Sequence, residues 1–249
     1  MISFIDIFLS HTGAKHVLCI VPINTLQNWI HEFNMWLPED ESIDKYFKKE
    51  SNGDMKYRKF KVFAISEAKS ITTRAKEILT WRKSGGVLLL GYEMYRILTT
   101  VSNNKNKKDE DMDPKILNDI NTKVKESLID PGPDLVVCDE GHRIKNCNAA
   151  TSQALKKIKT KRRIVLTGYP LQNKLLEYWC MVDFVRPNYL GLKGEFVNMF
   201  ERPITNGQCT DSTPHDRQVM KYRAHVLYQL LKGFVQRFGS LIKVNFILN

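Results

Sequence analysis

Short apolar runs that alternate with helical stretches constrain the fold of this 249-residue chain more than any other feature of its sequence. The runs are rich in β-branched or leucine residues and end at glycine, proline or polar residues, which is typical of buried strands. They occupy residues 17–21, 60–65, 86–91, 135–138 and 164–166. Strands that alternate with helices at this spacing form βαβ units, which build a parallel sheet with helices on both faces. The sequence therefore predicts an α/β fold with a parallel sheet.

Helices are predicted between these strands and after the last of them. They cover residues 26–37, a stretch ending near residue 83, 92–98, 116–128, 149–158 and 175–184. Beyond Pro187 the strand pattern stops, and helices near 195–200 and over 216–231 predict a helical appendage. Val219, Tyr222, Val226 and Leu230 are expected to share one apolar side of the longer helix.

The predicted organisation has three parts: a sheet-containing lobe over residues 1–187, a helical appendage over 188–237 and a divergent tail over 238–249. The tail could form one strand. Residues 102–115 are mixed in charge and are predicted to be a mobile insertion.

Composition limits the classes of function. The chain has 38 Lys and Arg against 27 Asp and Glu, a formal charge of +11. This excess favours a polyanionic partner, although many basic proteins bind no nucleic acid. No apolar run approaches the roughly 18 residues of a membrane span. Five cysteines without a CxxC pair argue against a zinc ribbon and a disulfide framework, and predict buried thiols in a reducing compartment.

An acidic motif follows the run at residues 135–138. Asp139, Glu140, Gly141 and His142 stand where a parallel strand would end, and open α/β sheets bind their ligands at that edge. Mg²⁺ prefers carboxylate oxygen and water, so Asp139 is the predicted metal ligand. Glu140 is the predicted group that positions an attacking water, and His142 would couple this loop to its neighbours. The simpler alternative is a strand end whose acids only meet solvent.

A second polar motif follows the run at residues 164–166. Thr167 lies 28 residues after Asp139, which leaves room for one intervening helix. Its hydroxyl could contact the acidic loop, and Gly168 would permit a tight turn toward Pro170. The motif continues through Gln172. Alone it would indicate only a turn, but it strengthens the functional interpretation of the acidic motif.

Two other strand-to-helix junctions carry groups suited to phosphate contacts. The candidates are Pro22, Asn24, Thr25 and Asn28 at the first junction, and Tyr92 and Arg96 at the second. Backbone N–H groups at a helix start attract phosphate, although a simple helix cap explains the first junction about as well. A basic run of Lys157, Lys159, Lys161, Arg162 and Arg163 is better explained as a solvated loop.

Together these residues resemble the first recombinase-like lobe of SNF2-type ATPases, which translocate along double-stranded DNA. Residues 21–29 resemble the family's motif Ia, residues 92–96 lie where motif Ib is expected, residues 139–142 match motif II (a DEGH box) and residues 166–173 match motif III. The resemblance runs from residue 1 to about residue 237. Residues 91–96, 130–134 and 206–209 look like the ATRX branch, and residues 24–29 and 166–170 look like its androgen-receptor-interacting, helicase-like members.

The resemblance implies ATP and Mg²⁺ as cofactors, with Glu140 and Asp139 catalytic, and His142, Thr167, Gly168 and Gln172 coupling the nucleotide site to its surroundings. It also implies double-stranded DNA or chromatin as partner, with nuclear receptors or other transcription factors, and a nuclear location. Family members have a glycine-rich loop ending in Gly-Lys-Thr just before a helix that resembles residues 1–10. No such loop occurs in these 249 residues, and neither does the family's second lobe. We therefore expect a fragment or truncated form without ATPase activity of its own.

Three interpretations follow. The first is that the chain is part of an ATP-dependent translocase, the second that it is a non-enzymatic module that binds DNA or a partner protein, and the third that it is a polypeptide that folds poorly. The third rests on the expectation that the parallel sheet lacks a central strand and so exposes apolar surface.

Overall fold

The computed structural model describes residues 1–39, 57–65, 70–100, 114–168, 175–233 and 235–236. Two compact units compose the chain: Met1–Pro170 with Phe184–Arg186, and Leu171–Asp183 with Pro187–Asn249. Most of the predicted insertion at 102–115, Gln172 and the predicted tail at 238–249 lie outside the described residues.

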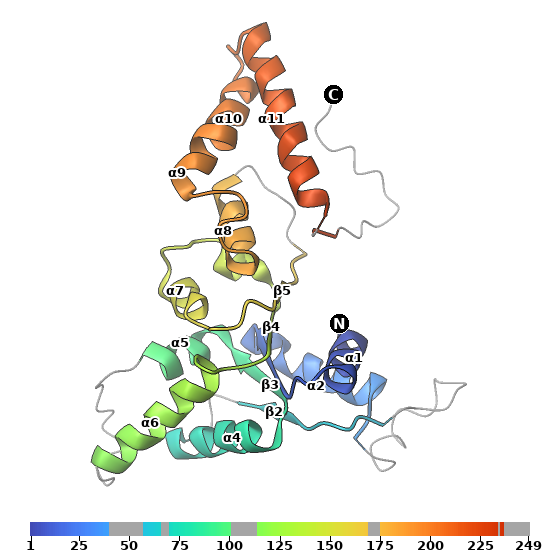
Figure 1. Ribbon diagram of the computed structural model, residues 1–249, viewed down its shortest axis with the longest axis vertical. Coiled ribbons are helices and arrows are strands. Elements are labelled where there is room, and N and C mark those ends of the chain that lie inside the picture. The colour runs from blue at the N-terminus through green and yellow to red at the C-terminus, as the bar shows by residue number, and fades with distance from the viewer. Residues whose placement is uncertain (40–56, 66–69, 101–113, 169–174, 234, 237–249) are drawn as a thin grey trace. The chain divides into compact units, whose positions relative to one another are not determined.

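A five-stranded parallel sheet in the order β2-β3-β1-β4-β5 forms the centre of the first unit (Figure 1). Its strands are β1 His16–Val21, β2 Val62–Ala64, β3 Gly86–Gly91, β4 Leu135–Cys138 and β5 Arg163–Val165. The prediction of an α/β fold with a parallel sheet is confirmed. β1, β3 and β4 are almost wholly buried, whereas β2 and β5 are partly exposed edge strands.

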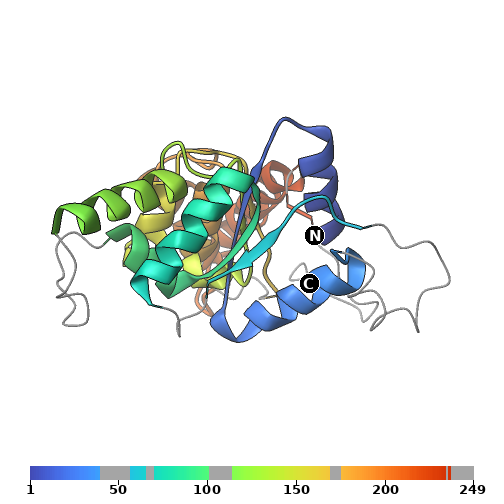
Figure 2. The ribbon, with the colours of Figure 1, turned by 90° about the horizontal axis from the view of Figure 1, so that it is seen from below.

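Helices cover both faces of the sheet (Figure 2). Side chains alternate between the two faces along each strand, so both faces carry apolar side chains that helices bury. On one face, Val17, Cys19 and Val21 of β1 share a core with α1 Ile2–His11 and α2 Leu26–Trp36. The other face carries α4 Ile71–Ser84, α5 Tyr92–Thr100, α6 Pro114–Leu128 and α7 Ala150–Lys156. No helix in the described part of the chain is both long and apolar enough to cross a membrane.

The expectation of a gap in the middle of the sheet is wrong for the described residues. Each strand pairs with its neighbour without interruption, from β2 at one edge to β5 at the other. The buried central strands therefore have partners on both sides, which removes the stated reason to expect poor folding.

The second unit is helical. It contains α8 Leu175–Val185 except its last two residues, which belong to the first unit, and α9 Lys193–Phe196, a π-helical turn Val197–Glu201, α10 Arg202–Gln208 and α11 Pro214–Lys232. α10 and α11 approach closely at Gly207, where an added Cβ would lie 2.3 Å from Met220 Cβ. The predicted apolar side of α11 is only partly right, because Val219 and Val226 are half-buried but Tyr222 is 63% exposed and Leu230 is 38% exposed. Leu227 and Leu231 are buried instead, which rotates the packed side by about one residue.

Arg163 is buried at the start of β5, which corrects its assignment to a solvated basic loop. Only 5% of the residue is exposed. Its Nη1 donates to Phe184 O at 2.8 Å, its Nη2 to Ile158 O at 2.6 Å and to Lys156 O at 3.4 Å, and its Nε to Thr160 O at 2.9 Å. The guanidinium therefore satisfies carbonyls beyond α7 and near the end of α8 that would otherwise be buried without donors.

Arg163→Lys should lower the free energy of unfolding by about 2–3 kcal/mol, because one ammonium cannot reach the same set of carbonyls. Urea unfolding of the purified chain measures the loss. Arg162→Lys, at the neighbouring exposed position, is the matched control and should change stability by less than about 0.5 kcal/mol. Equal effects at the two positions would contradict this role for Arg163.

Asp134 fixes the entry to β1 from a distant part of the chain. Its Oδ2 accepts hydrogen bonds from the backbone N–H groups of Lys15 and His16, both at 2.8 Å. Burial opposes ionisation of this carboxyl, but the two N–H donors and the nearby His16 outweigh it and lower the pKa of Asp134.

A lowered pKa in the folded state gives stability that is present above the unfolded pKa and is lost as the pH falls through the folded pKa. Asp134→Asn should therefore cost about 1–2 kcal/mol of unfolding free energy at pH 7, and the difference from wild type should shrink as the pH falls below the unfolded pKa of about 3.9. Asp130→Asn, whose carboxylate pairs with exposed Lys159, is the control. A pH-independent difference would count against the assignment.

Candidate functional site

The parallel sheet places the four predicted junctions at one edge. In register, Val21 of β1 pairs with Gly91 of β3, Ile20 with Cys138 of β4, and Cys138 with Val165 of β5. The residues that follow these strands are therefore neighbours, although they are spread over more than 140 positions. They include Asn24 and Thr25 after β1, Tyr92 after β3, Asp139 and Glu140 after β4, and Thr167 after β5.

Asp139 is held by hydrogen bonds from three other elements. Its N–H donates to Ile20 O at 2.9 Å, and its carbonyl accepts the hydroxyl of Tyr92 at 2.5 Å. Its Oδ2 accepts the indole N–H of Trp29 at 2.8 Å, and its Oδ1 accepts the N–H of Glu140 at 2.9 Å. The backbone and the carboxylate are thus both oriented before any ligand binds.

Glu140 adopts a left-handed backbone conformation, with φ 50° and ψ 56°. Such a conformation costs an L residue other than glycine about 1–2 kcal/mol. The strained turn leads into the short 3-10 helix Gly141–Ile144, which brings His142 back toward the acid. His142 Nδ1 lies 3.2 Å from Glu140 Oε2, and both side chains remain partly exposed.

The acidic loop packs directly on the second motif. Gly141 N donates to Leu166 O at 2.8 Å, and Leu166 N donates to Cys138 O at 2.8 Å. An added Cβ on Gly141 would lie 2.1 Å from Val165 Cγ1, so glycine is required there by close approach. Thr167 and Gly168 follow at the exposed end of the strand, and Gln172 lies outside the described residues. Gly168 has no left-handed φ, and a Cβ there would meet no atom within 4 Å.

The residues predicted to contact DNA fall into two groups. Asn24 and Asn28 are exposed, and Arg96 is partly exposed. Pro22 is buried, and the Thr25 hydroxyl donates to its carbonyl at 3.0 Å. Tyr92 is only 5% exposed, and its burial, with the nearby Cys138 and Asp139, raises the pKa of its phenol. Tyr92 therefore supports Asp139 from within and has little surface with which to reach a DNA backbone.

Glu93 and Trp29 are site residues that sequence reasoning missed. Glu93 forms an ion pair with Arg96, which lowers the pKa of the carboxyl and raises that of the guanidinium. Their i, i+3 spacing on a helix could have revealed the pair. Trp29 lies within residues 21–29 that resemble motif Ia, and its spacing with the other apolar residues of 26–37 predicts only a helix face. An apolar spacing pattern does not indicate that the indole N–H of Trp29 donates a hydrogen bond.

The described residues fit a magnesium ion that is held mainly by water and phosphate. They contain no group of three or more His, Cys, Asp or Glu placed to hold a metal. Mg²⁺ commonly uses one or two carboxylates and keeps several waters, so Asp139 with Glu140 is a suitable donor set. The residues that would bind the phosphates of a nucleotide are not found in the same way, because the 249 residues contain no Gly-Lys-Ser or Gly-Lys-Thr sequence.

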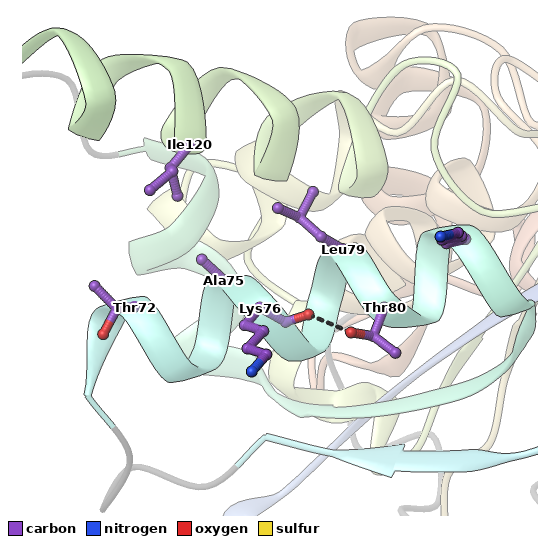
Figure 3. A pocket seen from close by; sticks show the side chains of 7 residues that line it. Thr72, Ala75, Lys76, Leu79, Thr80 and Ile120 are labelled. Carbon is purple, nitrogen blue, oxygen red and sulfur yellow. Dashed lines mark hydrogen bonds between the residues drawn. The ribbon is translucent and has the colours of Figure 1, made fainter.

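A separate groove lies between α4 and α6 (Figure 3). Its volume is about 490 Å³, and its lining consists of Thr72, Ala75, Lys76, Leu79, Thr80, Lys83 and Ile120. None of these side chains is an acid, a histidine or a cysteine. The groove contains no residue of the acidic loop and adds nothing to the site.

A parallel α/β lobe with an acidic loop at the carboxyl edge of its sheet is the class of ligand-binding domain that this fold and site define. Residues 1–243 match the family model of the SNF2-related domain. The chain therefore belongs to the SNF2-related domain family.

Its relatives include helicases and transcriptional regulators. Identity to Helicase ARIP4 of Xenopus tropicalis is 54% over 259 residues, which cover 97% of this chain and 18% of that protein. Identity to the Transcriptional regulator ATRX homolog of Drosophila melanogaster is 45% over 226 residues, covering 91% of this chain and 15% of that protein. These matches confirm the predicted ATRX-like branch. The chain spans less than a fifth of the length of these relatives.

Solved structures support the fold. The Sulfolobus solfataricus SWI2/SNF2 ATPase core in complex with dsDNA superposes with a TM-score of 0.56 at 20% identity, covering 92% of this chain and 35% of that chain. The Sulfolobus solfataricus SWI2/SNF2 ATPase core domain gives a TM-score of 0.55 at 18% identity, covering 95% of this chain and 35% of that chain.

Gly141→Ala should lower the free energy of unfolding by about 1–3 kcal/mol, because its Cβ collides with Val165. Gly168→Ala is the matched control and should be nearly neutral, since its Cβ meets open space. In a Val165→Ala background, where Cγ1 is gone, the cost of Gly141→Ala should fall by more than half. Equal costs in the two backgrounds, measured by urea unfolding, would show that the contact is not the cause.

Proposed function

We propose that this chain forms the metal-holding and DNA-facing part of an ATP-dependent motor that translocates along double-stranded DNA in chromatin or transcription. The observation that carries the proposal is the oriented Asp139–Glu140 loop, packed against the strand that leads to Thr167. Membership of the SNF2-related domain family supports this function, as does the solved relative whose structure holds dsDNA.

Each acidic side chain has a separate role in this proposal. Bound Mg²⁺ would neutralise phosphate charge. Asp139 would hold the ion largely through water, because each carboxylate oxygen keeps acceptor capacity beyond its one hydrogen bond. Glu140, with its side chain 41% exposed, would accept a hydrogen bond from the attacking water and orient it. His142, beside Glu140, would transmit the state of this loop to its neighbours.

The DNA-facing part would consist of exposed groups at the same edge of the sheet. Asn24 in the turn before α2, Asn28 in the first turn of α2 and Arg96 on α5 would contact backbone phosphates. The sheet-containing lobe, residues 1–187, would carry these contacts, with residues 188–237 as its appendage. A nuclear location, and transcription factors such as nuclear receptors as partners, belong to the same proposal. Similarity to the Transcriptional regulator ATRX homolog of Drosophila melanogaster supports its part in transcription.

A second candidate function is a non-enzymatic module that binds DNA or a partner protein. The formal charge of +11 favours it, because a basic surface binds polyanions without any catalysis. The two functions differ in whether a motor that contains this chain together with a phosphate-binding loop loses ATP turnover when Glu140 is replaced.

We expect the 249-residue polypeptide to show no ATP turnover above background, with or without duplex DNA. Its sequence lacks the glycine-rich loop whose backbone N–H groups and lysine hold the phosphates. A coupled-enzyme ATPase assay with Glu140→Gln as control tests this. DNA-stimulated turnover that disappears in the variant would overturn the expectation while supporting the assignment of Glu140.

Binding of duplex DNA should weaken steeply as salt rises. Arg96→Gln should flatten the log–log salt slope by about 0.9, because one phosphate contact is lost. Glu93→Gln should tighten binding roughly 2- to 5-fold, because Arg96 no longer has a competing carboxylate. Fluorescence anisotropy measures both effects, with Arg162→Gln as control. Equal salt slopes for Arg96→Gln and Arg162→Gln would remove Arg96 from the interface.

A further inference from the structure

Trp29 reaches Asp139 from a helix that is 110 positions earlier in the chain. The indole N–H is a donor only, and here it points at a carboxylate oxygen at 2.8 Å. The ring is half-buried and packs at a tilt on Phe33, with 6.3 Å between centroids. Both the donor and the ring that carries it are therefore fixed relative to α2.

The hydrogen bond from Trp29 determines the orientation in which the Asp139 carboxylate faces a ligand. Its Oδ1 accepts the N–H of Glu140 and its Oδ2 accepts the indole, so rotation of the carboxylate breaks at least one hydrogen bond. The Glu140 donor is the next backbone N–H in the chain and is available in many conformations. Trp29 is the donor that belongs to a different element, and so it selects one side-chain orientation.

We propose that Trp29 is a positioning residue that presets the carboxylate of Asp139 for a divalent cation. The proposal rests on the function proposed above, in which Asp139 holds Mg²⁺. Hydrogen bonds to metal-binding carboxylates typically change metal affinity by 10- to 100-fold when removed. Because Trp29 stands on α2, which begins directly after the turn that contains Asn24 and Thr25, the orientation of the metal ligand also depends on the placement of α2.

The chain contains a matched control on the same helix. Trp36 lies seven residues after Trp29, and its indole donates to Glu32 Oε2 at 2.8 Å. The donor, the acceptor type and the distance are the same, but Trp36 is 62% exposed and its indole bonds to a residue of its own helix and not to the acidic loop. A general effect of losing an indole–carboxylate bond on α2 would therefore appear in both variants.

The test uses Mn²⁺ alone as the probe, because this paramagnetic ion broadens NMR signals of nearby nuclei. In the ¹⁵N-labelled 249-residue chain, the backbone N–H signals of residues 139–141 and the indole signal of Trp29 should broaden first. Trp29→Phe should raise the Mn²⁺ concentration that is needed for half-broadening of residues 139–141 about 10-fold. Trp36→Phe should leave that concentration unchanged.

A second variant separates positioning from folding. Replacement of Trp29 by 3-benzothienylalanine keeps the size of the ring and exchanges the N–H for sulfur, so it should weaken Mn²⁺ binding as Trp29→Phe does. If binding matches wild type in this variant, the positioning role is overturned and the metal assignment stands. If wild type shows no broadening at residues 139–141, the metal assignment fails and the positioning role fails with it.

Discussion

The parallel register of β1, β3, β4 and β5 is the constraint on which the rest of the structure depends. Parallel strands end at the same edge, so four loops from distant parts of the sequence meet there. The central strands are buried on both faces, which makes a register slip costly because it would carry apolar side chains out of their cores. The placement of Asp139 is thus a consequence of packing throughout the lobe.

Close backbone approach converts this shared edge into an ordered site. Gly141 lets the acidic loop touch β5, and the N–H of Gly141 bonds to Leu166 O at 2.8 Å. The strained turn at Glu140 is held by these contacts, since an isolated loop would relax from a left-handed conformation. The packing of the lobe therefore holds Glu140 in a backbone conformation that is unfavourable by itself, as is common at functional sites.

The sequence was informative wherever one residue type has one physical explanation. Apolar runs predicted all five strands, and an acidic pair after a buried strand predicted the edge that carries the site. Contacts between distant residues were not predictable in this way. Arg163 belongs to a basic run, but the carbonyls that require it come together only in the fold. Trp29 fits an apolar helix face, and Tyr92 fits a DNA contact, until their polar atoms are seen to meet at Asp139.

We propose that the carboxyl edge of the sheet is the surface of this lobe that binds its ligands, including duplex DNA. Photocrosslinking with duplex DNA that carries a diazirine on its phosphate backbone tests this most directly, with mass spectrometry to locate the modified residues. The account predicts crosslinks at Asn24, Asn28 and Arg96, and few at Lys161 or Arg162, which precede β5 at the opposite edge. Crosslinks concentrated at Lys161 and Arg162, with none near Asn24, Asn28 or Arg96, would contradict it.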